Sequence, residues 1–249
     1  MRTQALVLRS VDFGESDRVL HLLVPESGRL TVIAKGARRS VKRFSGTLDY
    51  FNYLAVQIDR RRSTVMARLD QATLIRTYSS LRSDPKRFAL GCYLLELLDR
   101  LAPEGAGRAE ARQLFELALA SLEMIATWNA DVRLRTLLEL RLLDGLGLRP
   151  ELRSCVRCGR APETPEVDFH VAEGGPVCGA CAAQLQGLIR VHLGTLRALE
   201  QGLRFAPEQL DRLALGGATL DEARRLIERF RRFHVGLALK SEPFLDSAL

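Results

Sequence analysis

The sequence predicts an α+β protein of two domains, with a small barrel of β-strands at residues 1–82 and an α-helical bundle at residues 83–249. Three observations lead to this prediction. Short apolar segments with strand-like alternation fill the first 76 residues, helical periodicity dominates after Leu81, and two C-x2-C pairs interrupt the helical part. A chain of 249 residues with 47% hydrophobic residues suffices for one or two domains with a sizeable core.

Five segments of the first domain are predicted to be strands: residues 3–11, 17–24, 29–34, 52–59 and 64–76. The turn sequence PESG at residues 25–28 separates the second strand from the third. Five strands in so short a stretch, with no full-length helix among them, predict a closed or half-open barrel. The simplest nucleic-acid-binding barrel of this size is the OB-fold.

The second domain begins at Ser83, Asp84 and Pro85, which supply a capping side chain and a proline in the first helical turn. This first helix runs to Leu101, and its wide apolar surface implies burial among several helices. Further helices are predicted at about 108–127, 131–146, from 182 onward, 192–203, 207–214 and 220–239. The last of these has an apolar stripe of Leu220, Ala223, Ile227, Phe230, Phe233 and Leu237. We therefore expect a compact helical bundle with an insertion at about residues 151–184.

The insertion contains two C-x2-C pairs, Cys155 with Cys158 and Cys178 with Cys181, separated by 19 residues. Two thiolates from each tight turn can complete a tetrahedron around a zinc ion. Because no histidine or carboxylate stands at ligand spacing, we expect a four-cysteine zinc knuckle that holds one structural Zn²⁺ ion. The alternatives are two disulfides or a redox C-x-x-C. The fifth cysteine, Cys92, is expected to be a buried small hydrophobe.

The net charge of +7 is concentrated in the first domain. Residues 1–82 carry 15 Lys and Arg against 7 Asp and Glu, whereas the rest of the chain carries 22 against 23. This asymmetry indicates a polyanion-binding module attached to a nearly neutral partner domain. The candidate DNA-binding residues are Lys35, Arg38, Arg39, Lys42 and Arg43, together with the hairpin tip Arg60, Arg61 and Arg62. A basic loop that is only solvated is the alternative.

Aromatic residues close to this basic segment are candidates for stacking on bases, as in single-strand-binding proteins. They are Phe44, Tyr50, Phe51 and Tyr53. Because Phe51 and Tyr53 alternate on a predicted strand, at least half of the set is expected in the core. Arg225, Arg229 and Arg232 share a face of the last predicted helix by their spacing, and this face is expected to be solvated.

The sequence contains few signs of an enzyme. The four histidines are scattered, and neither a G-x-x-x-x-G-K-[ST] phosphate loop nor a nucleophile motif is present. Asp59 and Asp70 could serve as the metal pair of a nuclease, but isolated carboxylates at strand ends are usually solvated. The sequence therefore predicts a binding protein that catalyses no reaction.

Four segments resemble the RecO family of bacterial recombination mediators: ALVLR at residues 5–9, FGESDR at 13–18, PESG at 25–28 and AKGARR at 34–39. The order of a basic barrel, a helical domain and a late four-cysteine knuckle matches as well. The resemblance implies a DNA-repair protein that binds single- and double-stranded DNA and anneals complementary strands. With RecR, such a protein helps RecA to load on DNA covered by single-strand-binding protein.

The resemblance also implies which residues contact the partners. DNA contacts carry over to Lys35, Arg38 and Arg39, whereas Lys42, Arg43 and Arg60–Arg62 extend this set from charge alone. The helical domain is expected to present an apolar groove, rimmed by Lys or Arg, to the acidic C-terminal tail of single-strand-binding protein.

Two other functions stay open at this point. An RNA-binding OB and zinc protein of translation or RNA processing would need the same basic barrel, and a nuclease would need a metal-binding pair. The chain shows no signal peptide and no stretch of roughly 18 uncharged apolar residues. We therefore expect a cytoplasmic, nucleoid-associated protein.

Overall fold

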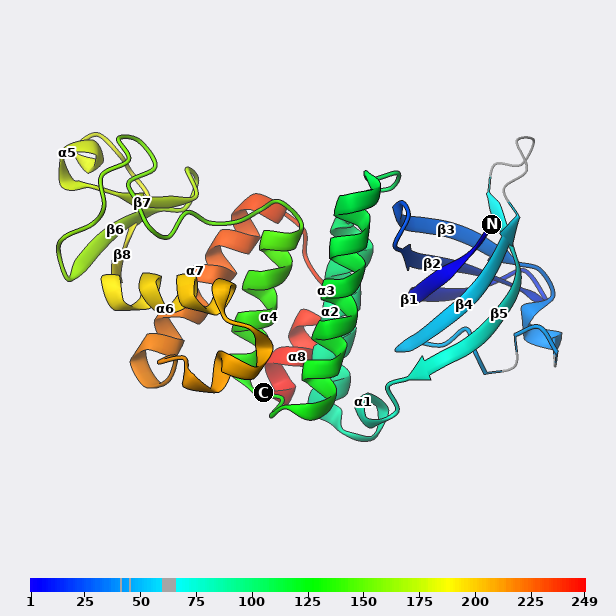
Figure 1. Cartoon of the computed structure of the whole chain (residues 1–249). Helices are drawn as coiled ribbons and strands as arrows, with labels where there is room; N and C mark the ends of the chain where they lie inside the picture. The colour runs from blue at the N-terminus through cyan, green and yellow to red at the C-terminus, as the bar shows by residue number, and fades with distance from the viewer. Residues whose placement is uncertain (41, 45, 60–65) are drawn as a thin grey trace. The chain divides into compact units, whose positions relative to one another are not determined.

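The structure is a computed structural model that describes residues 1–40, 42–44, 46–59 and 66–249. The chain forms two compact units (Figure 1). The barrel unit comprises Met1–Ala130 and Leu239–Leu249, and the cysteine unit comprises Asp131–Ala238. The division between residues 82 and 83, and the bounds of the insertion, stay predictions. None of the described helices combines the length and the hydropathy needed to cross a membrane.

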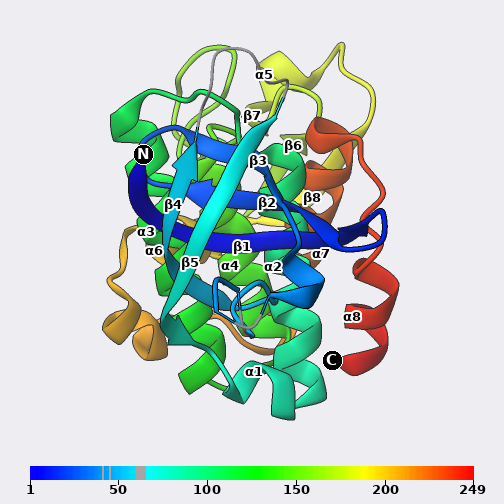
Figure 2. The ribbon, with the colours of Figure 1, turned by 90° about the vertical axis from the view of Figure 1, so that its right-hand side faces the viewer.

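The barrel unit contains a closed barrel of five strands in the order β1-β2-β3-β5-β4, which Figure 2 shows from the side of β5. The strands are β1 (Arg2–Phe13), β2 (Asp17–Val24), β3 (Gly28–Ala34), β4 (Asn52–Asp59) and β5 (Ala67–Thr77). All pairs are antiparallel except β3 with β5. The long β1 strand pairs with both β2 and β4, and its register shifts between Val7 and Arg9. Such a bulge increases the local bend and twist of a strand and helps the sheet to close. The predicted OB-fold barrel is confirmed.

The barrel core follows from period-two alternation along the strands. On β4, Leu54, Val56 and Ile58 point inward, whereas Ala55 and Gln57 are exposed. Opposite strands supply Leu20, Leu22, Val32 and Leu69 among others. Phe44 and Leu48, from the segment between β3 and β4, also belong to this core.

Four helices complete the barrel unit: α1 (Ser80–Ser83), α2 (Pro85–Leu101), α3 (Arg108–Thr127) and α8 (Glu242–Ala248). The predicted start of α2 is confirmed, since the Asp84 carboxylate accepts a hydrogen bond from the Arg87 N–H at 2.9 Å. Helix α2 packs against β1, and α3 packs against β2 and β3. Polar contacts hold α2 to the barrel, because Nδ1 of His21 lies 2.5 Å from the carboxylate of Asp99.

The turn between β2 and β3 also contacts the loop that joins α2 to α3. Gly28 adopts a φ of +76°, and a Cβ atom at this position would lie 2.4 Å from the carbonyl oxygen of Pro103. The N–H of the next residue, Arg29, donates to the same oxygen at 3.0 Å. Only glycine permits both the left-handed backbone and this close approach.

The cysteine unit combines three long helices with a small sheet of order β7-β6-β8. Its elements are α4 (Val132–Gly145), β6 (Glu166–His170), β7 (Gly175–Val177), α5 (Gly179–Ala182), β8 (Leu188–His192), α6 (Leu193–Arg204), the 3-10 turn η2 (Pro207–Arg212) and α7 (Gly217–Val235). Helices α4, α6 and α7 pack on one another. Their core contains an ion pair, in which Nε of the fully buried Arg231 lies 2.6 Å from Oε1 of Glu139. A buried guanidinium requires such a partner, because an uncompensated charge in the core would be costly.

Several elements differ from the sequence-based predictions. A helix was predicted to begin at about residue 182, but the short helix α5 ends at Ala182 and the β8 strand follows it. Residues 207–212 form a 3-10 turn in place of a helix, and α8 was not predicted at all. The stripe on α7 is buried only in part. Phe233, within the helix, is exposed, and Leu237 is exposed beyond the end of the helix at Val235.

Candidate metal centre and nucleic-acid interface

The first cysteine pair lies on a tight turn after α4. The N–H of Gly159 donates to the carbonyl oxygen of Cys155 at 2.9 Å, and the N–H of Cys155 donates to Arg160 at 2.8 Å. Gly159 has a φ of +74°, which a residue with a side chain adopts only with strain. This turn directs both thiols, those of Cys155 and Cys158, to one side.

The second pair lies where β7 joins α5. Cys178 precedes the first residue of this short helix, and its carbonyl oxygen accepts the N–H groups of Cys181 and Ala182, both at 2.9 Å. The Sγ atoms of all four cysteines lie within 4.8 Å of one another, and those of Cys158 and Cys178 are 3.6 Å apart. Four thiolates at 2.3 Å from one zinc ion would be separated by about 3.8 Å. The predicted ligand set is therefore assembled in a geometry that fits a metal ion.

The protonation of the thiols agrees with this fit. Burial acts to raise the pKa of Cys155, but N–H groups of Cys178, Cys158 and Arg157 outweigh it and lower the pKa to about 6. The hydrogen bond with Cys178, helped by burial, raises the pKa of Cys181 to about 12. Four thiols so close together cannot all ionise without a cation, and a divalent metal ion would supply the missing positive charge.

The alternatives for these cysteines fit the geometry less well. No disulfide is formed, and the 3.6 Å between Cys158 and Cys178 is far beyond the roughly 2.05 Å of an S–S bond. A redox site needs one pair, whereas both pairs converge here on one point. Cys92 is only half-buried, and burial raises its pKa to about 11.

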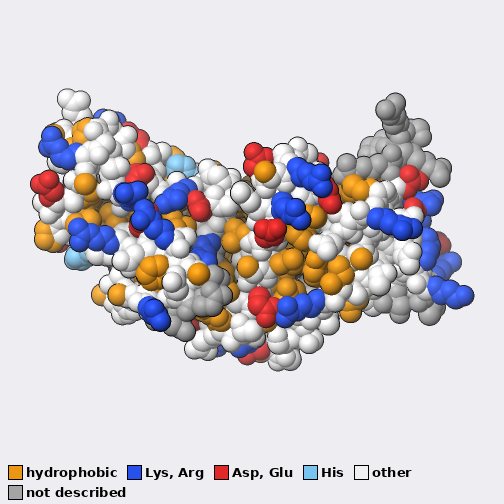
Figure 3. Space-filling view, in the orientation of Figure 1, with side chains coloured by type: hydrophobic (Ala, Val, Ile, Leu, Met, Phe, Trp, Pro, Cys, Tyr) orange, Lys and Arg blue, Asp and Glu red, His pale blue; other side chains and the backbone are white. Residues whose placement is uncertain are grey.

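The basic segment of the barrel unit follows the end of β3 at Ala34, as predicted. Lys35 and Gly36 lead into the 3-10 turn η1 (Ala37–Arg39). Lys and Arg side chains gather along the edge of the barrel that lies on the right in Figure 3. Lys35, Arg38, Arg39, Lys42 and Arg43 are all exposed.

The hairpin between β1 and β2 holds this segment in place. Nζ of Lys35 lies 2.7 Å from the Asp17 carboxylate, which also accepts the N–H of Gly36 at 2.8 Å. These donors keep the pKa of Asp17 below its usual value, and the hydrogen bond from Lys35 has the largest effect. The N–H of Arg38 donates to the carbonyl oxygen of Ser16 at 3.0 Å. The basic turn is thus fixed to the hairpin by backbone and side-chain contacts.

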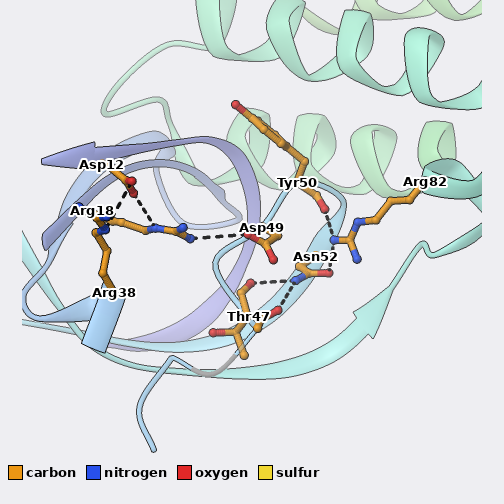
Figure 4. Close-up of polar contacts among 9 residues, drawn as sticks. Asp12, Arg18, Arg38, Thr47, Asp49, Tyr50, Asn52 and Arg82 are labelled. Atoms are coloured by element: carbon orange, nitrogen blue, oxygen red, sulfur yellow. Dashed lines mark hydrogen bonds and ion pairs between the residues drawn. The ribbon is translucent and has the colours of Figure 1, made fainter. Parts of the chain in front are cut away.

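Not all of the predicted cations are equally available. Arg18 and Arg38 share the carboxylate of Asp12 at 3.0 and 3.5 Å, and Arg18 also lies 3.6 Å from Asp49 (Figure 4). Arg43 donates to the Lys35 carbonyl oxygen at 2.8 Å. Exposed pairs of this kind are weak, so a phosphate can compete for these cations.

Two predicted residues, Arg39 and Lys42, make no side-chain hydrogen bond or ion pair with any part of the chain that the structure describes. They are the cations most available to a polyanion. The tip Arg60–Arg62 lies outside the described residues, and its role stays a prediction.

The aromatic residues proposed from sequence turn out to be mostly structural. Phe44 and Phe51 are buried, and the ring of Tyr53 packs against Phe115 of α3 at 5.9 Å between centroids. Tyr50 is exposed, and its carbonyl oxygen and the side chain of Asn52 both accept hydrogen bonds from Arg82 (Figure 4). These contacts fix the loop that leads into β4 through its backbone and leave the Tyr50 ring exposed, so Tyr50 stays a candidate for stacking on bases.

An exposed aromatic residue that the sequence reasoning missed lies elsewhere. Phe13, the last residue of β1, is 56% exposed at the hairpin that carries Asp17. The sequence could have indicated this exposure, because Phe13 directly precedes Gly14, which has a φ of +59°. A tight glycine turn is too short to cover the side chain of an adjacent apolar residue.

The barrel unit also contains a pocket of about 480 Å³ between β1, α2 and the segment before α8. Its apolar lining includes Leu8, Cys92, Leu95 and Phe244, and its cations are Arg9, Arg100 and Lys240. The pocket's carboxylates are engaged, since Asp99 binds His21 and Glu96 binds the start of α8. A cationic rim around an apolar floor suits an acidic segment with apolar side chains.

Comparison with known proteins identifies this combination of a closed barrel and a four-cysteine site as that of a DNA repair protein. Residues 1–78 match the family model "Recombination protein O N terminal", and residues 82–243 match "Recombination protein O C terminal". The chain therefore belongs to the RecO family of DNA repair recombination mediators, which is not a family of enzymes.

Several curated relatives carry the name "DNA repair protein RecO". The relative from Anaeromyxobacter dehalogenans (strain 2CP-C) is 34% identical over 250 residues, which cover 99% of this chain and 96% of the relative. The relative from Myxococcus xanthus (strain DK1622) is 38% identical over 248 residues, covering 97% and 95% of the two chains. The relative from Syntrophus aciditrophicus (strain SB) is 30% identical over 249 residues.

Proposed function

We propose that the chain binds single- and double-stranded DNA along the basic edge of its barrel and anneals complementary strands. The observation that carries this proposal is the pair Arg39 and Lys42, exposed and without a side-chain partner among the described residues, at the end of an OB-fold strand. Lys35, Arg38 and Arg43 belong to the same short basic segment. Such a surface releases condensed counterions from phosphates and offsets the repulsion between two strands.

The contacts of this surface require no particular base sequence. Lysine and arginine side chains bind phosphates, which are the same in every strand, so the protein can act at any gap. With RecR as partner, it would promote the loading of RecA on single-stranded DNA covered by single-strand-binding protein. The place of action would be the bacterial cytoplasm, at the nucleoid.

For the acidic C-terminal tail of single-strand-binding protein, we place the contact at the pocket of the barrel unit. An apolar side chain of the tail would enter between Leu95 and Phe244, and its carboxylates would face Arg9 and Lys240. Neither cation has a side-chain partner in the described part of the chain. The pocket draws on β1 as well as on helices, so the full chain is the proper material for measuring tail binding.

One Zn²⁺ ion would be held by Cys155, Cys158, Cys178 and Cys181. When bound, it would supply charge balance and a rigid cross-link between the two turns. All four ligand positions would be protein thiolates, so the ion has no open position for a substrate. Its role in the proposed function is structural.

A strand-annealing assay tests this proposal. Two complementary oligonucleotides are mixed, one carrying a fluorophore and the other a quencher, with and without single-strand-binding protein. We expect the full chain to accelerate annealing in both cases and to lose the effect as salt increases. If the protein did not increase the annealing rate at low salt, the proposal would be contradicted. Binding measured on DNA and RNA oligonucleotides of one sequence separates it from the alternative, since a function in translation or RNA processing predicts a preference for RNA.

A further inference from the structure

The outer face of the first barrel strands carries an apolar strip next to the basic segment. Directly opposite residues of paired strands share one face of a sheet. Val11 pairs with Val19, Val19 pairs with Ile33, and Phe13 pairs with Asp17. Because Leu20 and Val32 point into the barrel core, these alternate residues point outward. We define the apolar strip as Val11, Phe13, Val19 and Ile33.

The helices of the barrel unit cover only one end of this outer face. Further along the same strands, His21 contacts Asp99 of α2, and Arg29 contacts the same carboxylate at 3.6 Å. Towards the hairpin this cover ends, since Val11 and Phe13 are 44% and 56% exposed. Val11 and Phe13 are two residues apart on β1 and share this face, and a contiguous exposed apolar patch rimmed by polar residues marks an interaction site.

The charges around the strip indicate the chemistry of that ligand. Six cations stand against three carboxylates in the hairpin and the basic segment: Arg18, Lys35, Arg38, Arg39, Lys42 and Arg43 against Asp12, Glu15 and Asp17. Two of the carboxylates are already engaged, Asp12 by Arg18 and Asp17 by Lys35. A cationic border beside apolar and aromatic side chains fits a polyanion that also exposes flat apolar groups, which is the description of single-stranded DNA.

The hairpin is fixed, not free, relative to those cations. Asp17, opposite Phe13, accepts from Nζ of Lys35 and from the N–H of Gly36, and Ser16 accepts from the N–H of Arg38. Phe13 therefore lies on a hairpin that is hydrogen-bonded directly to the basic segment. OB-folds bind oligonucleotides on the face of their second and third strands and on the loop between the first and second. The strip occupies this region.

We propose that Phe13 stacks on an unpaired base and that Val11, Val19 and Ile33 form the apolar surface beneath the neighbouring base, while Arg39 and Lys42 bind the phosphates. This inference rests on the proposed function and adds the element that distinguishes single strands from duplexes. In a duplex the bases are stacked on each other and are not available to Phe13. The residue thus gives the protein a preference for the unpaired strand.

The test compares Phe13→Ala with the full wild-type chain on three probes of about 16 nucleotides: oligothymidylate, the same backbone with abasic sites throughout, and a duplex. We expect the substitution to weaken oligothymidylate binding by roughly 5- to 150-fold, the range for the loss of one stacked base. Affinity for the abasic strand and the duplex should not change. The salt dependence of oligothymidylate binding should keep its slope, because no charge is removed.

The matched control is Phe233→Ala on α7, since Phe233 is 59% exposed and lies far along the chain in the cysteine unit. It should leave all three affinities unchanged. A second measurement uses Phe13→Trp in a Trp128→Phe background, which places the chain's one tryptophan at the hairpin. Stacking should quench its emission on oligothymidylate and leave it unchanged on the abasic strand.

The outcomes separate the inference from the function on which it rests. If the wild-type chain bound none of the probes, both would fail. If it bound them and Phe13→Ala lost nothing on oligothymidylate, or lost equally on the abasic strand, only the stacking role would be overturned. A change of molecular mass in solution on Phe13→Ala, measured by sedimentation, would assign the strip to contact between two copies of the chain and would likewise overturn it.

Discussion

Gly91 of α2 packs directly on the ring of Phe51. A Cβ atom at Gly91 would lie 2.7 Å from Cε1 of Phe51 and 3.0 Å from a methyl group of Leu81. Phe51 is fully buried and has a φ of +65°, the one positive value among the described residues other than glycine. A bulky residue holds such a backbone only when its surroundings fix it. The contact with α2 therefore helps to keep the start of β4 in place, together with the hydrogen bonds of Arg82.

This relationship predicts the effect of Gly91→Ala. The added methyl group must displace the buried ring of Phe51 or the side chain of Leu81, so we expect a loss of about 1–3 kcal/mol in the free energy of unfolding, measured by urea denaturation. The control is Gly194→Ala on α6, where a Cβ atom would meet nothing within 4 Å. That substitution should be neutral or stabilise by up to about 1 kcal/mol. Equal effects of the two substitutions would refute the packing role of Gly91.

Glu96 of α2 holds the beginning of α8. Its carboxylate accepts the N–H groups of Lys240 and Ser241 at 2.9 and 2.8 Å and the Ser241 hydroxyl at 2.6 Å. Burial acts to raise the pKa of Glu96, but these hydrogen bonds outweigh it and hold the pKa below its usual value of 4.5. A carboxylate with a lowered pKa stabilises the fold above the pKa of the unfolded chain, and this stabilisation disappears as pH falls through the pKa of the folded chain.

The predicted substitution is Glu96→Ala. At neutral pH it should lower the free energy of unfolding by about 2 kcal/mol, since hydrogen bonds to a charged acceptor are lost. The difference from wild type should shrink as pH falls below about 4.5, as measured by denaturation at a series of pH values. Glu116→Ala is the control, because this side chain is well exposed and, among the described residues, pairs only with Arg112 of the same helix. A difference that stayed constant from pH 7 to well below 4 would show that the charge of Glu96 has no role.

The four-cysteine site predicts one zinc ion per chain, measured by elemental analysis. Cys158→Ser should remove most of the metal, because an alcohol is a poor replacement for a thiolate. We expect the Tm to fall by about 5–10 °C, which corresponds to about 2–4 kcal/mol for a chain of this size. Cys92→Ser is the control for the chemical change, and it should leave the zinc content unchanged. A metal-free Cys158→Ser protein with the wild-type Tm would mean that the site does not stabilise the fold.

The elements that could be predicted from sequence are those that local patterns specify. Alternation and turn residues gave the five barrel strands, and the spacing of Cys155, Cys158, Cys178 and Cys181 was enough to place the four thiols together. The start of α2 at Ser83, Asp84 and Pro85 was also predicted, and Asp84 is the residue whose side chain caps the helix. In each case the residues that specify the element are neighbours in the chain.

The elements that were missed depend on contacts between distant residues. Helix α8 starts where Glu96, more than 140 residues earlier, caps it. The β8 strand exists because it pairs with β6 through residues such as Val191 and Val167. Phe51 was a candidate for stacking on bases because the sequence does not reveal that α2 covers its ring. Phe13 was overlooked for the converse reason, since the sequence does not reveal that its ring is left exposed.

The cations of the barrel edge give the last prediction. We choose Arg39→Glu with Lys42→Glu, because these side chains have no partner in the part of the chain that the structure describes, so their reversal breaks no ion pair. Binding to a single-stranded oligonucleotide should weaken by orders of magnitude at low salt. Each lost phosphate contact on a single strand lowers the slope of log affinity against log salt by about 0.7, so the slope should become shallower by about 1.4. Annealing should fall in parallel, while zinc content and Tm stay at wild-type values.

The matched control reverses Arg225 and Arg229, two exposed arginines on α7, and should cost much less affinity. If the control lost more than the barrel variant, the DNA-binding face would lie on the cysteine unit, and the assignment of DNA binding to the barrel would be wrong.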